Sequence, residues 1–580
     1  MPRILCKPRR LRRACLALAA WPLTVAAAGP NAATPQLLPA TPATLQTTCD
    51  ALPAALAGLA DTVITGATSV PAGGLMLAGQ PVPAHCRVTG RMNDRVGPID
   101  GRPYAIGFEI RLPIQWNGRF FHQGNGGADG SVVPATGTAG GGPRTGALLQ
   151  GFAVLSSDAG HSGAYGTTFG VDPQARLDYG YQAVGTLTPM AKQAIAIAYG
   201  KGPDRSYFGG CSNGGRHTLI AAARYADDYD GFLAGAPGYN LPLAALANIF
   251  GAKQYASVAT GNPATPAGLE TAYTAAERRT VANAILERCD ALDGAADGLV
   301  QDTKACQAHF NLNRDVPTCS GERDGRCLTK AQKAVVSSIA KGATTSTGER
   351  FYASFPYDAG IGSGGIPFWE FVAPLVLDSG AVGFVFKTPP ESMATFNGPT
   401  FTLGADIDTL LAQLYATNAT YTEAGMSFMT PPSATRMGHV RERGGKILVY
   451  HGVSDPIFSI EDTQAWYRGV DAHTGKRAGD FVRLYDVPGM GHCSGGPATD
   501  QADFLTPLVA WVEHGQAPGA LVASARGPGN PGGVNPEVPA NWAPDRTRPL
   551  CAYPSVARYV GHGDIERAAS FVCTTKNKRH

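Results

Sequence analysis

The sequence predicts an α/β fold in which a mostly parallel sheet, with helices on both faces, is interrupted by one long insertion. Short apolar runs of strand length alternate with helical patterns between residues 104 and 236, which is typical of βαβ units. Strand patterns then lapse until about residue 442 and resume at Lys446. We therefore expect one core in two parts, 49–237 and 443–580, with a lid domain, 238–442, inserted between them, because a long insertion in a surface loop costs little closure entropy.

Each expected element has its own pattern. Residues 104–112 alternate apolar and polar side chains, as a half-buried strand does, and the other strands are short apolar runs. Apolar residues at helical spacing predict helices at 181–199 and 217–224. The segment 49–86 allows no assignment beyond a short disulfide clip. The expected strands are 104–112, 119–123, 152–156, 206–210, 231–236, 447–450 and 481–487.

The first 28 residues have the pattern of a secretory signal. Six basic residues precede an apolar run, 14–28, that ends in three alanines. A membrane anchor is the alternative, but the run is short for a bilayer and Pro22 interrupts it. Residues 29–48, rich in Ala, Pro and Thr, are expected to form a flexible lead-in. We therefore expect a secreted or periplasmic protein with no stable membrane insertion once the signal is removed.

Charge and cysteine content agree with export. Loss of the six basic residues of the signal lowers the formal charge from +3 to −3, so no basic surface for nucleic acid is indicated. Ten cysteines remain after the signal. An even number in an exported chain favours disulfides over metal thiolates, and no Cys-x-x-Cys pattern is present.

The core is organised around Gly210-Cys211-Ser212-Asn213-Gly214. An apolar strand pattern precedes this Gly-x-Ser-x-Gly motif and a helical pattern follows it, which is the context of a nucleophile elbow. The glycines leave room for the sharp turn, and the helix N-terminus places N–H groups beside the serine. The bare motif is also compatible with a plain glycine-rich turn. Its setting predicts an α/β-hydrolase core with Ser212 as the nucleophile.

Such a core needs an acid and then a histidine, each on a loop after a strand. Asp455 follows the strand 447–450, and His492 follows the strand 481–487. We predict that Asp455 orients His492, and that His492 takes the proton of Ser212. The alternatives are a turn aspartate before Pro456 and a solvated loop histidine. The rival histidines lack this order and setting; they are His122, His161, His217, His451 and His473.

Cysteines flank two of these residues. Cys211 precedes Ser212 and Cys493 follows His492. If Ser212 and His492 form a hydrogen bond, their chain neighbours must also be close. We therefore predict a Cys211–Cys493 disulfide that ties the nucleophile loop to the histidine loop.

An acidic loop lies in the insertion. Asp290, Asp293 and Asp297 occur within eight residues, next to glycines that permit tight turns. Carboxylate and carbonyl oxygens in such a loop suit a hard cation such as Ca²⁺. The spacing differs from that of an EF-hand, and a solvated acidic turn is the alternative.

Together these residues resemble the tannase and feruloyl esterase family of α/β-hydrolases. The resemblance covers residues 49–573, nearly the whole mature chain. Its marks are Gly-Cys-Ser-x-Gly-Gly at 210–215, Gly-x-Ser-Asp-Pro at 452–456, Gly-His-Cys at 491–493, the Asp/Gly loop from Cys289, and Arg-Pro-Leu-Cys-x-Tyr-Pro from Arg548.

The resemblance implies site residues beyond those argued from the residues themselves. It implies an oxyanion hole from the backbone N–H groups of Asn213 and Gly126, the latter in the glycine-rich loop 124–130, which is otherwise compatible with a plain turn. It places Phe458 beside an aromatic substrate ring. It implies structural Ca²⁺ in the lid, held by Asp290, Asp293 and Asp297 side chains and the Ala295 and Leu299 carbonyls. The implied disulfides are Cys49–Cys86, Cys211–Cys493, Cys289–Cys306, Cys319–Cys327 and Cys551–Cys573.

The expected function is a secreted serine esterase for small esters of aromatic acids, feruloyl or galloyl in type. Trp369 is expected to line the ring pocket, although packing in a core explains it equally well. A mono(2-hydroxyethyl) terephthalate-type hydrolase is the alternative; it is less favoured because no arginine between Arg350 and Arg436 is present to bind the free carboxylate, although Lys387 offers a charge. A peptidase shares the triad chemistry. A rival of another class is a non-catalytic secreted ligand-binding protein on a hydrolase scaffold.

Overall fold

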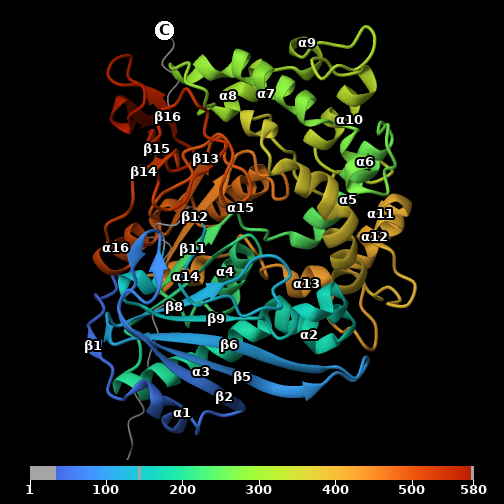
Figure 1. The fold of residues 1–580 in the computed structure, drawn as a ribbon. Helices are drawn as coiled ribbons and strands as arrows, with labels where there is room; N and C mark the ends of the chain where they lie inside the picture. The colour runs from blue at the N-terminus through green and yellow to red at the C-terminus, as the bar shows by residue number, and fades with distance from the viewer. Residues whose placement is uncertain (1–33, 141–145, 576–580) are drawn as a thin grey trace, which may run out of the picture.

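A nine-stranded sheet forms the centre of the molecule, in a computed structural model that describes residues 34–140 and 146–575 (Figure 1). The strand order is β13-β12-β11-β10-β8-β9-β6-β5-β2. The pairs from β9 to β13 are parallel, whereas β6, β5 and β2 add antiparallel at one edge. The strands are β2 (Thr62–Val70), β5 (His85–Val96), β6 (Pro103–Pro113), β8 (Arg119–Gly124), β9 (Ala153–Ser157), β10 (Arg205–Cys211), β11 (Gly231–Gly235), β12 (Lys446–Gly452) and β13 (Val482–Val487).

Helices cover both faces of this sheet because side chains alternate along each buried strand. Phe208 and Phe232 pack with residues of α3 (Ala183–Tyr199), α4 (Asn213–Arg224) and α15 (Ile460–His473) on one face. Their neighbours Tyr207 and Leu233 pack with α16 (Leu505–His514) on the other. The structure therefore confirms the predicted α/β core with a mostly parallel sheet.

The expected strands agree with observed strands to within one or two residues. The segment before them, which allowed no assignment, contains β2 and the first part of β5. The Cys49–Cys86 disulfide joins it to the sheet. The other short elements of the first core part are β1 (Ala43–Thr44), η1 (Cys49–Ala51), α1 (Leu52–Ala55), β3 (Met76–Leu77), β4 (Gln80–Pro81), β7 (Gln115–Trp116), η2 (Leu148–Gln150), η3 (Gly163–Val171), α2 (Pro173–Leu177) and η4 (Asp178–Gln182).

The lead-in differs from the expectation of a flexible segment. In its described part, 34–48, β1 pairs with β7. The backbone N–H of Ala40 donates to Glu513 at 2.9 Å and that of Thr41 donates to Asp204 at 2.8 Å. Composition alone hides these bonds, because the partners are backbone groups and distant carboxylates. The signal predicted at 1–28 lies outside the described residues.

The stretch 238–442 is helical, with its own apolar cluster that includes Tyr255, Ile285 and Phe310. Figure 1 shows its longer helices α5, α7 and α10 grouped beside the core. Its elements are α5 (Leu241–Ala256), α6 (Pro266–Glu270), α7 (Ala275–Cys289), η5 (Asp290–Asp293), α8 (Thr303–His309), α9 (Leu312–Asp315), α10 (Lys330–Ala340), η6 (Ala359–Gly362), η7 (Phe368–Val372), η8 (Pro374–Asp378), η9 (Ala381–Phe386), α11 (Gly398–Gly404), α12 (Ile407–Leu414), α13 (Gly425–Met429) and α14 (Gly438–Glu442).

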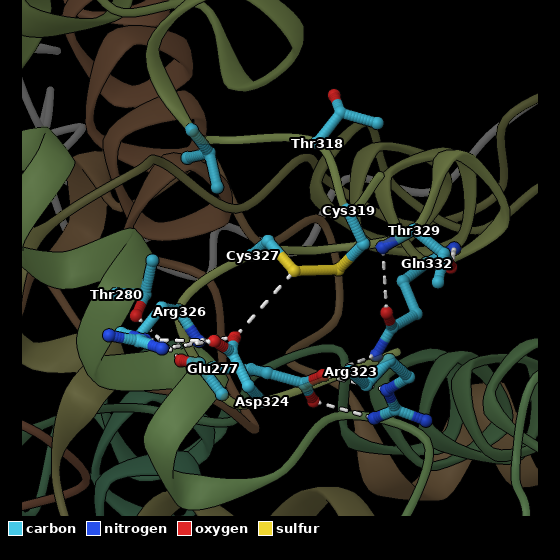
Figure 2. The surroundings of a disulfide bond; sticks show 12 residues. Glu277, Thr280, Thr318, Cys319, Arg323, Asp324, Arg326, Cys327, Thr329 and Gln332 are labelled. Carbon is cyan, nitrogen blue, oxygen red and sulfur yellow. Dashed lines mark hydrogen bonds and ion pairs between the residues drawn. A yellow bond between two sulfur atoms is a disulfide. The ribbon is translucent and has the colours of Figure 1, made fainter. Parts of the chain in front are cut away.

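Two disulfides fasten this helical stretch, Cys289–Cys306 and Cys319–Cys327. Figure 2 shows the second, where Arg323 inside the small loop pairs with Glu277 at 2.7 Å. Thr329 and Gln332, just beyond it, form the capping box that begins α10. The Cys319–Cys327 disulfide therefore lies directly before the N-terminus of α10.

The C-terminal part adds two small hairpins against the acidic loop of the lid. Cys551–Cys573 lies within them, and Ala295 packs with Cys551, Ala557 and Phe571. Among the described residues, no helix is both long enough and apolar enough for a transmembrane segment. The remaining elements are η10 (Ala478–Asp480), β14 (Leu521–Ser524), β15 (Thr547–Leu550), β16 (Val556–Tyr559), η11 (Ala568–Ser570) and β17 (Phe571–Thr574).

Candidate active site

Ser212 stands on a sharp turn between β10 and α4. Its φ of 66° and ψ of −125° are unusual for a residue with a side chain, and such strain is typical of functional turns. A Cβ at Gly210 or at Gly214 would collide with the carbonyl oxygen of Gly124. Both glycines are therefore required so that the elbow can pack against the end of β8.

The structure brings Ser212, His492 and Asp455 into one hydrogen-bonded chain. The Oγ atom of Ser212 lies 2.8 Å from Nε2 of His492. The Nδ1 atom of His492 lies 2.7 Å from Oδ2 of Asp455. This order of contacts is the one that lets a histidine accept a serine proton while a carboxylate stabilises the resulting cation.

Asp455 is fully enclosed and held from several sides. Its Oδ1 accepts the backbone N–H groups of Ile457 and Phe458, each at 3.0 Å. His451, four residues earlier, lies 3.3 Å from Oδ2. Burial alone raises the pKa of Asp455, but His492 and His451 outweigh it and hold that pKa well below its usual range. The carboxylate is therefore ionised at neutral pH.

The Cys211–Cys493 disulfide is present, with Cα atoms 6.0 Å apart and a sequence separation of 282. It joins the residue before Ser212 to the residue after His492. The turn of the serine and the loop of the histidine are thus covalently linked beside their hydrogen bond. The structure contains the other four expected disulfides as well.

The rival histidines have other partners. His217 Nε2 lies 2.9 Å from Oδ2 of Asp129, and the remaining four bond backbone or hydroxyl groups, although His451 also lies 3.3 Å from the Asp455 carboxylate. Those four contacts are His122 to Tyr229, His161 to Ala128, His451 to Thr463 and His473 to Gly469.

Both expected oxyanion residues adjoin the serine. Asn213 is the first residue of α4, where backbone N–H groups lack helical acceptors. A Cβ built on Gly126 would lie 3.9 Å from Cβ of Ser212, so the loop after β8 passes over the nucleophile turn. The site therefore has two candidate sources of N–H donors for a developing oxyanion.

A cleft of about 720 Å³ opens at Ser212 and His492. The expected ring-pocket residues lie against the histidine: the Trp369 ring centroid is 4.8 Å from that of His492, and the Phe458 centroid is 5.3 Å away. Trp369 lines the cleft, whereas Phe458 is buried and is not among its lining residues. Among described residues, the lining includes no Lys, Arg, Asp or Glu. The cleft thus offers an aromatic wall and mainly uncharged surroundings.

Other lining residues escaped the sequence argument. Leu75 and Leu77, near the β3–β4 hairpin, and Val133 and Pro134, after the glycine-rich loop, also border the cleft. They come from segments without a motif. Only the contact between these distant segments and the elbow reveals them.

The acidic loop is compact and electrostatically strained. Burial, together with the nearby carboxylates of Asp297 and Asp290, raises the pKa of Asp293 to about 8. A cation would relieve this repulsion. However, the Asp297 carboxylate pairs with Arg548, and Asp290 accepts the N–H groups of Asp297 and Gly298.

The described residues contain no group of three or more His, Cys, Asp or Glu side chains arranged to hold a metal ion. The Ala295 carbonyl and the Leu299 carbonyl belong to the same loop, so the donor set has the right chemistry for Ca²⁺. Calcium here remains a prediction.

Comparisons with known proteins agree with this geometry. The family model for tannase and feruloyl esterase matches residues 86–574. Mono(2-hydroxyethyl) terephthalate hydrolase from Piscinibacter sakaiensis is 40% identical over 525 residues, covering 85% of each chain. Feruloyl esterase B from Aspergillus oryzae superposes with a TM-score of 0.72 at 25% identity, covering 91% of this chain and 99% of the other.

A third similarity concerns the fold alone. Tannin acyl hydrolase from Aspergillus niger superposes with a TM-score of 0.67 at 20% identity, covering 93% of this chain and 97% of the other. The family match spans both core parts and the helical stretch between them, and it confirms the resemblance drawn from the motifs. The chain therefore belongs to the tannase and feruloyl esterase family and is a carboxylic ester hydrolase.

Proposed function

We propose that this chain is a secreted serine esterase that hydrolyses esters of aromatic acids, feruloyl or galloyl in type, through an acyl-enzyme. The observation that carries the proposal is the hydrogen-bonded chain from Asp455 through His492 to Ser212, beside a cleft whose described lining residues include no Lys, Arg, Asp or Glu. Ser212 is the only serine among the described residues that line this cleft, and its backbone has a positive φ.

The chemistry follows from the geometry. Ser212 Oγ attacks the ester carbonyl carbon while its proton passes to Nε2 of His492. Asp455 stabilises the imidazolium, and the backbone N–H groups of Gly126 and Asn213 stabilise the oxyanion. When the intermediate collapses, the C–O bond breaks and His492 returns the proton to the leaving alcohol. Water, activated by His492, then cleaves the acyl-enzyme and releases the aromatic acid.

The cleft favours an acyl group without a free charge. A carboxylate bound away from water needs a cationic or hydrogen-bonding partner, and the described lining contains no Lys or Arg. Trp369 instead offers a flat apolar face to an aromatic ring. The second candidate, hydrolysis of mono(2-hydroxyethyl) terephthalate, is favoured by the 40% identity to a relative that carries this name.

The decisive experiment compares three esters: methyl ferulate, methyl gallate and mono(2-hydroxyethyl) terephthalate. Ser212→Ala is measured beside the unmodified protein, with circular dichroism to verify its fold. We expect turnover of a neutral ester that falls at least about 10³-fold in the variant. Unchanged turnover in folded Ser212→Ala would refute the serine mechanism.

The same assay separates the rivals. A ligand-binding protein releases no product burst from an activated ester, whereas a serine esterase forms an acyl-enzyme and does so. A peptidase would cleave the matching amide at a comparable rate. Preference for mono(2-hydroxyethyl) terephthalate would replace the feruloyl or galloyl assignment while leaving the mechanism intact.

Export is part of the proposal. Five disulfides favour an oxidising compartment, and the predicted signal at 1–28 supplies the route. A protein that lacks residues 1–28 is expected to stay in the reducing cytoplasm, with its cysteines as free thiols. Equal export of the full and shortened chains would contradict this part.

We also propose that Ca²⁺ binds the loop of Asp290, Asp293 and Asp297 as a structural ion. In the oxidised protein, Ca²⁺ at 100 times its Kd should add about 2.7 kcal/mol to the free energy of unfolding. Asp293→Asn should abolish this gain. Asp324→Asn, an exposed lid carboxylate paired with Arg326, is the control and should keep it. A gain that survives in Asp293→Asn would exclude this loop.

A further inference from the structure

The glycine-rich loop over the nucleophile carries one ionisable side chain. Of the residues 126–130, only Asp129 has a side chain larger than a methyl group. Its backbone is left-handed, with φ of 55°, and its side chain is 2% exposed. A buried carboxylate in a loop of small residues requires compensating contacts.

Those contacts lie on the helix that follows Ser212. Asn213 Nδ2 donates to Asp129 Oδ2 at 2.7 Å, and His217 Nε2 lies 2.9 Å from the same oxygen. The side chain of Asp129 thus connects the loop of Gly126 to the residue whose backbone N–H is the second oxyanion donor.

The helix side of this contact is itself held in place. Arg216 Nε donates to Asn213 Oδ1 at 2.7 Å, which fixes the orientation of the amide. The guanidinium also donates to the carbonyls of Gly180 and Tyr179 at 2.8 and 2.9 Å. Burial, and then the charge of Arg216, hold the pKa of His217 well below its ordinary value, so the ring is neutral; its Nε2 also lies 3.2 Å from Arg216 Nη2 and 3.3 Å from Asn213 Nδ2.

The rest of the loop has further bonds: the backbone N–H of Gly130 donates to the carbonyl of Asp158 at 3.0 Å, and the Asn125 amide donates to the carbonyl of Ser157 at 2.7 Å. Tyr179 donates to the carbonyl of Gly127 at 3.3 Å, and His161 Nε2 lies 2.8 Å from the carbonyl of Ala128. These partners belong to η4 and to the segment after β9, not to α4. Asp129 is therefore the loop side chain that bonds the nucleophile helix, while the Asn213 amide also donates to the backbone carbonyl of Asn125 at 3.4 Å.

We propose that Asp129 is a positioning residue that keeps the backbone N–H groups of Gly126 and Asn213 at the separation needed to bind one oxyanion. This inference rests on the proposed serine esterase function and deepens it. Oxyanion donors act at 2.7–3.1 Å from the charged oxygen and chiefly in the transition state. A loosened loop is therefore expected to lower kcat while substrate binding is retained.

The test uses Asp129→Ala and Asp129→Asn in the full oxidised protein with the best ester substrate. Asp129→Ala should lower kcat about 10- to 100-fold and change KM less than about 3-fold. Asp129→Asn retains an oxygen acceptor for the Asn213 amide and should recover most of the loss. Asn213→Ala keeps its backbone N–H but loses the amide, and should resemble Asp129→Ala.

A second measurement separates positioning from a merely structural role. A trifluoromethyl ketone analogue of the substrate forms a hemiketal with Ser212, and the hemiketal oxygen lies in the oxyanion hole. The product acid forms no hemiketal. Asp129→Ala should lower the affinity for the ketone by the same factor as it lowers kcat/KM, and it should leave the Kd of the product acid unchanged. The double variant Asp129→Ala, Asn213→Ala should be no worse than either single one.

Asp230→Ala is the matched control, since Asp230 accepts the backbone N–H of Ser206 at the far end of the same strand, β10. It should lower stability without lowering kcat.

A folded Asp129→Ala with wild-type kcat and ketone affinity, or equal loss of ketone and product binding, would overturn the inference. If Asp129→Ala does not fold, Asn213→Ala decides by the same readouts. Ser212→Ala is measured in parallel. If Ser212→Ala is inactive and Asp129→Ala keeps wild-type activity, this inference alone is wrong. If the wild-type protein itself is inactive, the proposed function is wrong.

Discussion

At the scale of single residues, the candidate site depends on groups whose surroundings fix their protonation and orientation. Asp455 is buried, yet the histidines on either side and two backbone N–H groups keep it ionised. His492 is consequently held with Nδ1 toward Asp455 and Nε2 toward Ser212. The tautomer that can accept the serine proton is thus set by the carboxylate.

This orientation makes a prediction for Asp455→Asn. The amide keeps the shape of the side chain but presents an N–H or a neutral oxygen to Nδ1, so the imidazolium is no longer stabilised. We expect kcat to fall about 10³- to 10⁴-fold with KM little changed. Steady-state kinetics measure it, with Asp462→Asn as a control, since that neighbouring buried carboxylate bonds Tyr239 and Asn240. Equal losses in both variants would contradict the assignment.

The sequence could identify Ser212, Asp455 and His492 because each stands at a fixed place after a strand, in a fixed order. It could not identify His451 as a partner of Asp455, or Asp129 as a partner of Asn213. Asp129 meets Asn213 and His217 across more than eighty positions of chain, and no local pattern encodes that approach. His451 was visible only as a rival histidine.

At the scale of elements, the site is assembled from loops at the ends of parallel strands, and a disulfide joins two of them. Cys211–Cys493 links the end of β10 to the loop after β13, strands that are separated in the sheet by β11 and β12. Cys319–Cys327 closes a small loop in the lid, with a sequence separation of 8. The two bonds therefore differ in both loop length and distance from the nucleophile.

Replacing each cystine by a pair of serines tests this difference. Removing Cys211–Cys493 should lower the free energy of unfolding by about 2–5 kcal/mol and should also lower kcat, because the serine and histidine loops lose their link. Removing Cys319–Cys327 should cost less stability and leave kcat within about 2-fold. Activity and urea denaturation measure both pairs. A pair of variants with equal kcat would show that the bond does not position the loops.

The elements after the glycine-rich loop were predictable because buried parallel strands are continuous apolar runs. β2 and β5 were not, since they place charged and polar residues such as Arg87, Arg91 and Asp94 on an exposed face, and a register shift near Gly66 interrupts the alternation. The antiparallel direction of β6 has no periodicity signature. The short helices of the lid are broken by glycine and proline, which obscures helical spacing.

At the scale of the whole molecule, many carboxylates are buried without full compensation. Burial is the main cause that raises the pKa of Asp129, Asp158 and Asp378 to about 7, and that of Asp293 to about 8. Such groups bind a proton more tightly in the folded chain than in the unfolded chain, where the pKa is about 3.9. Their contribution to stability is complete at low pH and is lost as pH rises through the folded pKa.

Buried histidines act in the opposite direction, but in another range. Burial lowers the pKa of His122 to about 3 and that of His161 to about 4. The unfolded chain therefore binds the extra protons below about pH 6.5, and stability falls as the solution becomes more acidic there. This contribution fades between about pH 6.5 and pH 7.5 and is nearly constant above that range, so the carboxylates dominate the slope there.

We therefore predict that the free energy of unfolding of the calcium-free, oxidised protein falls by about 2–3 kcal/mol between pH 6.5 and pH 8. Buried Lys446, with its pKa lowered to about 8 by burial, offsets a small part near the upper limit. Urea denaturation at fixed ionic strength measures the change. Asp378→Asn, which keeps an acceptor for Asn248, should make the decline smaller, and Ca²⁺ should do the same if it holds Asp293 ionised. A free energy of unfolding that is constant or rises over this range would mean that these carboxylates are solvated or paired in the folded protein. It would also contradict the electrostatic repulsion assigned to the acidic loop.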